Sequence, residues 1–278
     1  MQTSLGWVED AAISFKRAVE LGPREPRVFY LYGYSLFEMH REAEARAALD
    51  RAVELAPDSV LYRLFRATAE ISWSGDTVRA NSILAGLPAG RDPDGRVTSA
   101  RCTTAVLERN FPEALRTLQA YPPDELPMIG SAGIGAPEPK AFSEGTVRLF
   151  AGDRAGAYEC FESIRWKYEL EVEDQPESVW ARGGLAELYA MMGWKEPALA
   201  EIARTTELET AAGTGAERRF NWAVVYAWLG EPDLAWPHIQ RLITPPSMLW
   251  VNDLRLDPAW DPLRNDPRFQ KLLATGKL

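Results

Sequence analysis

The strongest constraint on the fold of this chain is a recurring pair of residues, a small alanine followed four positions later by a large apolar side chain. The alanines are Ala11, Ala45, Ala80, Ala114, Ala157, Ala198 and Ala235, and their partners are Phe15, Leu49, Leu84, Leu118, Phe161, Ile202 and Ile239. Successive alanines lie 34, 35, 34, 43, 41 and 37 residues apart. Repeats of this length are typical of solenoids, in which each unit packs on its neighbours. The spacing therefore predicts an array of similar units.

The stretch 26–57 indicates what one unit is. Its marked positions are Phe29, Tyr32, Gly33, Leu36, Ala45, Leu49, Ala52 and Pro57. Small Gly33 and Ala45 allow two helix backbones to approach, the large apolar residues fill the seam between them, and Pro57 ends the second helix. These positions resemble the tetratricopeptide repeat (TPR) at every signature residue. The resemblance implies an all-α fold, an α-solenoid that winds as a right-handed superhelix of helix-turn-helix repeats.

The same register divides the chain into repeats. We expect a half repeat at 1–23, repeats at about 26–57, 61–92, 95–126, 138–175, 179–210 and 216–247, and a C-terminal cap at 248–278. The half repeat is a second helix from Asp10 to Pro23, with Gly6 in the turn before it and a partner helix expected ahead of Met1. Prolines and glycines crowd 122–139, so this stretch is predicted to be neither helix nor central strand. It either separates two sub-arrays or lies across the groove.

The C-terminal segment differs from the repeats. Asp257-Pro258 and Asp266-Pro267 each predict a helix start, since Asp is a good N-cap and Pro is favoured at the first helical position. The apolar residues there, which can fold back onto the last repeat, are Trp260, Leu263, Phe269 and Leu272. The run 256–273, preceded by 242–247, resembles the end of TPR arrays in bacterial multidomain signalling proteins, and this similarity covers 140–273. In those relatives the array often follows a kinase, cyclase or DNA-binding domain, which implies a sensory or docking role.

Composition excludes several classes of protein. The net charge of -9 and the isoelectric point near 5.0 argue against nucleic-acid binding, which depends on clustered Lys and Arg. No apolar run reaches the ~18 residues needed to span a membrane, and no signal peptide is visible. Cys102 and Cys160 fall within helical patterns, so we expect them to be reduced, in a cytoplasmic protein.

No pattern of catalytic residues stands out. His40 and His238, the two histidines, belong to distant repeats, so a metal site shared by both is not expected. Phosphate-binding glycine loops, nucleophile elbows and zinc-binding His-Glu-x-x-His motifs are absent from the sequence. The acidic residues of 169–177 fit a solvated helix end better than a cation site. We therefore expect no catalysis, no cofactor and no metal; a remote alternative is an enzyme with its site at the 122–139 loop.

The TPR resemblance also predicts a binding surface, because the first helix of each repeat lines the concave groove in that family. Carried over by register, the aromatic groove residues are Tyr30, Tyr34, Phe37, Tyr62, Phe65, Trp73, Phe142, Phe150, Trp180, Phe220 and Trp228, with Arg96, Ser99 and Thr103 also in the groove. The first six form either a partner-binding patch or a core that a neighbouring helix covers.

The type of partner follows from the same positions. Tyr30 and Tyr34 occupy places where chaperone-binding TPR domains hold a carboxylate, so an apolar or aromatic-rich protein segment is the expected ligand. The alternative is self-association through the N-terminal face and the aromatic patch.

Overall fold

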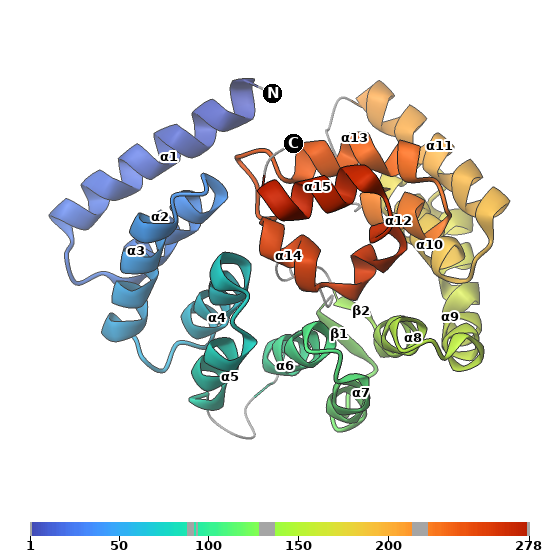
Figure 1. Cartoon of the computed structure of the whole chain (residues 1–278), viewed down its shortest axis with the longest axis horizontal. Coiled ribbons are helices and arrows are strands. Elements are labelled where there is room, and N and C mark those ends of the chain that lie inside the picture. Colours follow the sequence, from blue (N-terminus) through green and yellow to red (C-terminus); the bar gives the residue numbers. More distant parts are fainter. Residues whose placement is uncertain (1, 88–91, 93, 128–136, 213–221, 277–278) are drawn as a thin grey trace.

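The computed structural model describes residues 2–87, 92, 94–127, 137–212 and 222–276. Within these ranges the chain is built almost wholly of α-helices that pack in neighbouring pairs (Figure 1). This arrangement confirms the predicted all-α, solenoid-type architecture.

Six pairs of consecutive helices follow α1 among the described residues. They are α2 (Pro26–Glu38) with α3 (Glu42–Leu55), α4 (Val60–Ser74) with α5 (Thr77–Ala85), α6 (Arg96–Leu107) with α7 (Phe111–Gln119), α8 (Lys140–Phe150) with α9 (Arg154–Asp174), α10 (Val179–Met191) with α11 (Lys195–Ala212), and α12 (Trp222–Trp228) with α13 (Pro232–Leu242). Each pair up to α10 also contacts the next, through α3 and α4, α5 and α6, α7 and α8, and α9 and α10.

Close contact between the two helices of a pair explains the periodic small residues. A Cβ atom added to Gly33 would lie 2.7 Å from Cγ of Leu49, and one added to Gly145 would lie 2.5 Å from Cε1 of Phe161. Ala45 and Ala157, on the facing helices, are buried. A side chain larger than these would force the helix axes apart.

The N-terminal helix is longer than the sequence predicts. The first helix, α1 (Gln2–Leu21), is continuous through Gly6, so the predicted turn there is wrong. A single glycine inside a helix costs about 1 kcal/mol, which a helix of this length packed on α2 tolerates.

The ends of the proline-rich stretch form two short antiparallel strands, β1 (Glu125–Pro127) and β2 (Pro137–Pro139), with Glu125 opposite Pro139. Residues 128–136 between them lie outside the described residues, and α7 packs directly on α8.

The C-terminal segment folds back onto the last helix pair. It contains α14 (Val251–Leu256), the 3-10 helix η2 (Pro258–Leu263) and α15 (Pro267–Thr275). Asp257 and Asp266 cap η2 and α15, accepting hydrogen bonds from the backbone N–H groups of Ala259 and Arg268, so these starts lie where the Asp-Pro pairs predict them. The apolar residues of the segment share a core with α12 and α13; they are Leu254, Trp260, Leu263, Phe269 and Leu272.

The same segment also reaches the opposite end of the array. The helix pairs follow an arc from α1 to α11, and α14 and α15 lie inside it (Figure 1). Residues 244–257, here named the C-terminal strap, lead from α13 to the N-terminal repeats, where α14 packs on α4. None of the described helices is long and apolar enough to cross a membrane.

Candidate functional site

The C-terminal strap is hydrogen-bonded to the ends of two helices from the first repeats. The backbone N–H of Ser247 donates to the carbonyl oxygen of Glu38 at 2.8 Å. The Asn252 side-chain amide donates to the carbonyl oxygens of Trp73 at 2.8 Å and Ser72 at 3.2 Å. The last carbonyls of a helix lack partners within the helix. The strap therefore caps both α2 and α4.

Trp250 of the strap covers part of the predicted aromatic patch. The centroid of the Trp250 ring lies 5.3 Å from that of Phe37. The same ring stacks on His40, with centroids 4.3 Å apart, and meets the Trp73 ring edge-on at 6.4 Å. Phe37 is only 1% exposed, and Trp73 and Phe65 are also buried. Phe37 and Trp73 therefore lie beneath the chain's own C-terminal segment in this structure.

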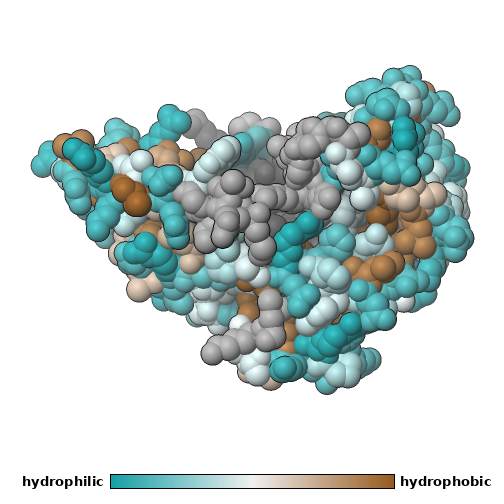
Figure 2. Space-filling model, turned by 90° about the horizontal axis from the view of Figure 1, so that it is seen from above, coloured by the Kyte–Doolittle hydropathy of each residue, from teal (hydrophilic) through white to brown (hydrophobic). Residues whose placement is uncertain are grey.

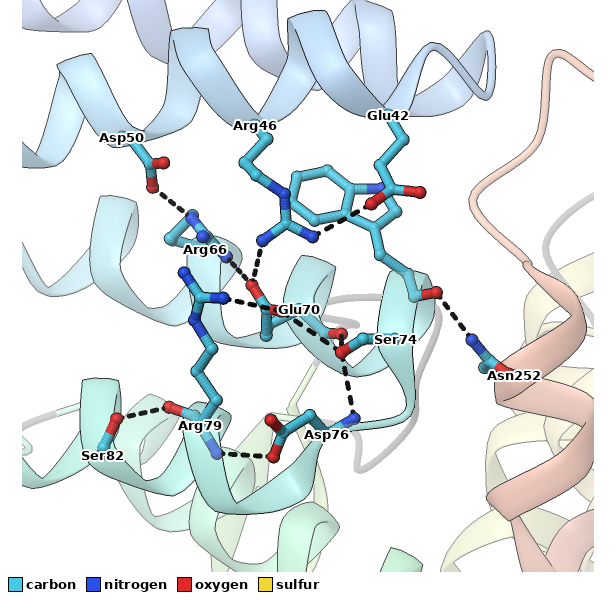
Figure 3. A network of polar contacts seen from close by, with 11 residues as sticks. Glu42, Arg46, Asp50, Arg66, Glu70, Ser74, Asp76, Arg79, Ser82 and Asn252 are labelled. Atoms are coloured by element: carbon cyan, nitrogen blue, oxygen red, sulfur yellow. Dashed lines mark hydrogen bonds and ion pairs between the residues drawn. The ribbon is translucent and has the colours of Figure 1, made fainter.

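An ion network centred on Glu70 joins α3 to α4 (Figure 3). Glu70, almost fully buried, accepts from Arg46 at 2.5 Å and from Arg66 at 2.6 Å. Burial opposes ionisation of Glu70, but the hydrogen bonds from both arginines outweigh it and lower its pKa. The guanidinium carbon of Arg46 lies 4.6 Å from the Trp73 ring centroid, a cation–π contact. The charges of this network compensate one another, so its role is to fix α3 against α4.

A pocket opens beside this covered core, between α2, α4, α6 and the strap. Its volume is about 390 Å³. It is lined by Tyr30, Tyr34, Leu61, Leu64, Phe65, Ala67, Thr68, Ile71, Leu84, Arg96, Ser99, Ala100, Thr103, Thr104, Leu107, Met248 and Asp253. Mostly apolar walls with a few polar groups are typical of ligand-binding sites. Tyr30 and Tyr34, which the sequence predicts to line the groove, are among the lining residues of this pocket.

The aromatic wall of the pocket is a packed set of rings. Tyr30 stacks on Tyr62 with centroids 5.0 Å apart and meets Phe65 edge-on at 5.6 Å, while Tyr34 lies 5.2 Å from Phe65. Burial raises the pKa of Tyr34 to about 12, and the neighbouring Glu38 and Tyr30 add to this effect. The phenol groups of Tyr30 and Tyr34, both with raised pKa values, therefore remain neutral near pH 7.

Asp253 is the buried charged group of the pocket. Its side chain is 1% exposed and accepts hydrogen bonds from the hydroxyl of Ser72 at 2.9 Å and from the backbone N–H of Trp250 at 2.7 Å. Burial raises the pKa of Asp253 to about 7. The other charged lining group, Arg96, is partly exposed and pairs with Asp94 at 2.8 Å.

The remaining predicted groove residues do not join this site. Phe142 is buried in the core of the C-terminal half, and Phe150 stacks on Trp228 at 5.6 Å. The indole N–H of Trp228 donates to the carbonyl oxygen of Ala259 at 3.0 Å, so this pair supports the cap. Trp180 is exposed, and Phe220 lies outside the described residues.

Sequence reasoning missed the two strap residues of the pocket, Met248 and Asp253. They follow the last repeat, and no periodic pattern relates them to residues of α2 or α4. Ser72 and Asp253, which are hydrogen-bonded, stand 181 positions apart. No local sequence pattern predicts this contact, because it forms only when the packing of all the helix pairs brings the two ends of the arc together.

Metal sites and known relatives give no further assignment. In the part of the chain that the structure describes, no group of three or more His, Cys, Asp or Glu side chains could hold a metal ion. Cys102 is buried and Cys160 half-buried, and neither forms a disulfide.

No protein-family model matches the chain, and no curated protein matches it at a significant level.

Proposed function

We propose that this chain is a tetratricopeptide-repeat scaffold that binds an apolar or aromatic-rich segment of another protein, without catalysing a reaction. The observation that carries the proposal is the 390 Å³ pocket, in which predicted groove residues from α2 and α4 meet the strap. Its size suits one or two large side chains of a bound segment. The neighbouring strap supports the proposal, because the C-terminal ends of α2 and α4 there accept hydrogen bonds from the Ser247 backbone and the Asn252 side chain.

The kinds of residue in the pocket support binding over catalysis. Aromatic residues dominate the energetics of protein interfaces, and Tyr30, Tyr34 and Phe65 form one wall here. Acid–base or nucleophilic catalysis needs several reactive groups within hydrogen-bond reach of one another. The described lining residues supply one carboxylate, Asp253, with neither a histidine nor a cysteine beside it.

The proposal extends to the cellular role. We place the chain in the cytoplasm, as the docking or sensing part of a bacterial signalling or regulatory protein. The features that support this are the resemblance of 256–273 to the ends of such arrays and the two unpaired cysteines.

A random peptide library displayed on phage tests the proposal. The immobilised protein is compared with Thr103→Phe, which places a ring inside the pocket, and with Thr210→Phe, which adds the same ring on an exposed face of α11. We expect the wild type and Thr210→Phe to enrich the same apolar or aromatic motif and Thr103→Phe to lose it. Enrichment that is identical in all three proteins, or absent from the wild type, would contradict the proposal.

A second candidate function is self-association through α1. This helix exposes Trp7 at 78% and Leu21 at 80%, and Ile13 between them is also exposed. Figure 2 shows apolar residues at the left end of the molecule, and further apolar patches on its right side. Light scattering over a hundredfold dilution decides this point, since a dimer held by α1 should become monomeric with Trp7→Glu.

A further inference from the structure

We infer that the pocket selects a primary ammonium group carried on an apolar stem, such as a lysine side chain within the bound segment. This inference rests on the proposed function and specifies the ligand of the same pocket. It follows from an uncompensated buried carboxylate, from the aromatic wall beside it and from the charges around both.

The carboxylate of Asp253 has capacity for another donor. Its two hydrogen bonds come from a hydroxyl and a backbone amide, which are neutral donors. A carboxylate offers about four acceptor positions. Among the residues that the structure describes, no lysine, arginine or histidine forms an ion pair with Asp253, although it is almost fully buried. Buried charges are usually paired, so a cationic ligand would complete this site.

The surrounding charges favour a cation as well. On the strap, Asp257 is close enough to raise the pKa of Asp253, and on α2 Glu38 adds negative charge beside Tyr34. The facing group on α6 is Arg96, which Asp94 holds at 2.8 Å. The positive charge of Arg96 is therefore paired with a carboxylate of its own, while Asp253 forms no ion pair among the described residues.

The other walls fit the rest of such a ligand. The rings of Tyr30, Tyr34 and Phe65 line the pocket, and aromatic rings attract a cation through their ring electrons. Leu64, Ile71 and Leu107 offer apolar surface to a methylene chain. A neutral apolar group would use the same walls but would leave Asp253 without a counter-ion.

The titration of Asp253 supplies a distinguishing signature. Burial raises its pKa to about 7, so the negative charge appears as the pH rises from 6 to 8. An alkylammonium group, with a pKa near 10, remains charged over this range. Affinity for an amine should therefore increase with pH, while affinity for a neutral ligand of the same shape should not.

The test uses 4-phenylbutylamine and its neutral counterpart 4-phenylbutan-1-ol as probes, with affinity measured by isothermal titration calorimetry. For the wild type we expect the amine to bind about tenfold more tightly at pH 8 than at pH 6, because the ionised fraction of Asp253 changes by about that factor. The alcohol should bind equally at both values. Asp253→Asn should abolish the pH dependence, and Tyr34→Leu should weaken the amine more than the alcohol.

Each outcome bears on a separate claim. If the amine and the alcohol bind with equal, pH-independent affinity, the ammonium inference fails while the apolar pocket stands. If neither probe binds the wild type, the ammonium inference also fails, and the peptide-display experiment judges the proposed function independently. The wild-type pH comparison is decisive even if Asp253→Asn proves to be misfolded.

Discussion

Replacing Gly33 by alanine should reveal how tightly the helices of a repeat are packed. The added Cβ would lie 2.7 Å and 2.8 Å from Cγ and Cδ2 of Leu49, and 3.2 Å from its backbone nitrogen. Leu49 is 1% exposed, so its side chain has little room to move. Overpacking of this kind costs about 1–3 kcal/mol, and replacing a helical glycine by alanine recovers about 1 kcal/mol. Gly33→Ala should therefore lower the free energy of unfolding by about 1 kcal/mol.

Truncating Leu49 should reverse the effect of Gly33→Ala on the free energy of unfolding. Leu49→Ala alone should cost about 2–5 kcal/mol, the usual range for a buried leucine. In that background the two closest contacts of the new Cβ disappear, and Gly33→Ala should be stabilising through its helix propensity. The double-mutant cycle should then give a coupling of about 1–3 kcal/mol.

The assay is urea unfolding followed by circular dichroism for the four proteins of the cycle. Gly184→Ala serves as a control within α10, where the nearest ring atom of Tyr168 lies 3.3 Å away and the clash is smaller. We expect this control to be neutral or stabilising. A coupling below about 0.5 kcal/mol between residues 33 and 49 would refute the packing argument, because independent sites add within that margin.

Three further predictions concern the strap and the ion network. Trp250→Ala should lower the free energy of unfolding by about 3 kcal/mol, the low end of the range for tryptophan truncation because Trp250 is only partly buried, and should increase hydrogen exchange at the Ser247 amide. Asp253 should stabilise the wild type as the pH falls from about 7 toward 4, by up to ~1.4 kcal/mol per unit, since native Asp253 holds its proton there and the unfolded form does not. Burial also raises the pKa of Glu187 to about 7 and adds a slope of the same sign, so Asp253→Asn should lose only the Asp253 part in urea titrations at pH 5 and 8. Glu70→Ala should cost about 3 kcal/mol in thermal or urea unfolding, because buried Arg66 and partly buried Arg46 lose their shared carboxylate. An unchanged midpoint in any of these variants would contradict the contact it probes.

The helix pairs were predictable because each depends on local, repeated chemistry. Gly33 faces Leu49 within one hairpin, and the Asp-Pro pairs fix the starts of the C-terminal helices without reference to the rest of the fold. Gly6 shows the limit of this reasoning, since a glycine allows a turn without requiring one. The helix α1 continues through it.

The site was less predictable, because its parts come from both ends of the chain. The sequence places Tyr30, Tyr34 and Trp73 on the groove side of their helices, and aromatic residues there are compatible with a free surface or with a covered core. The deciding residue is Trp250, which packs on Phe37 and Trp73 only because the arc of helix pairs closes far enough. The curvature of the arc is the sum of small rotations between neighbouring helix pairs. No short sequence motif predicts that sum.

Methionine methyl groups offer the most direct test of whether the pocket binds a protein segment. The chain has 6 methionines, and Met248 lines the pocket while Met191 and Met192 lie in the C-terminal half of the array. Carbon-13 methyl spectra would be recorded as a peptide selected by display is added, with Met248→Leu to assign the reporting signal. Binding in the pocket should shift the Met248 signal and leave those of Met191 and Met192 in place. A Met248 signal that stays unchanged while the peptide binds would show that the segment is held elsewhere.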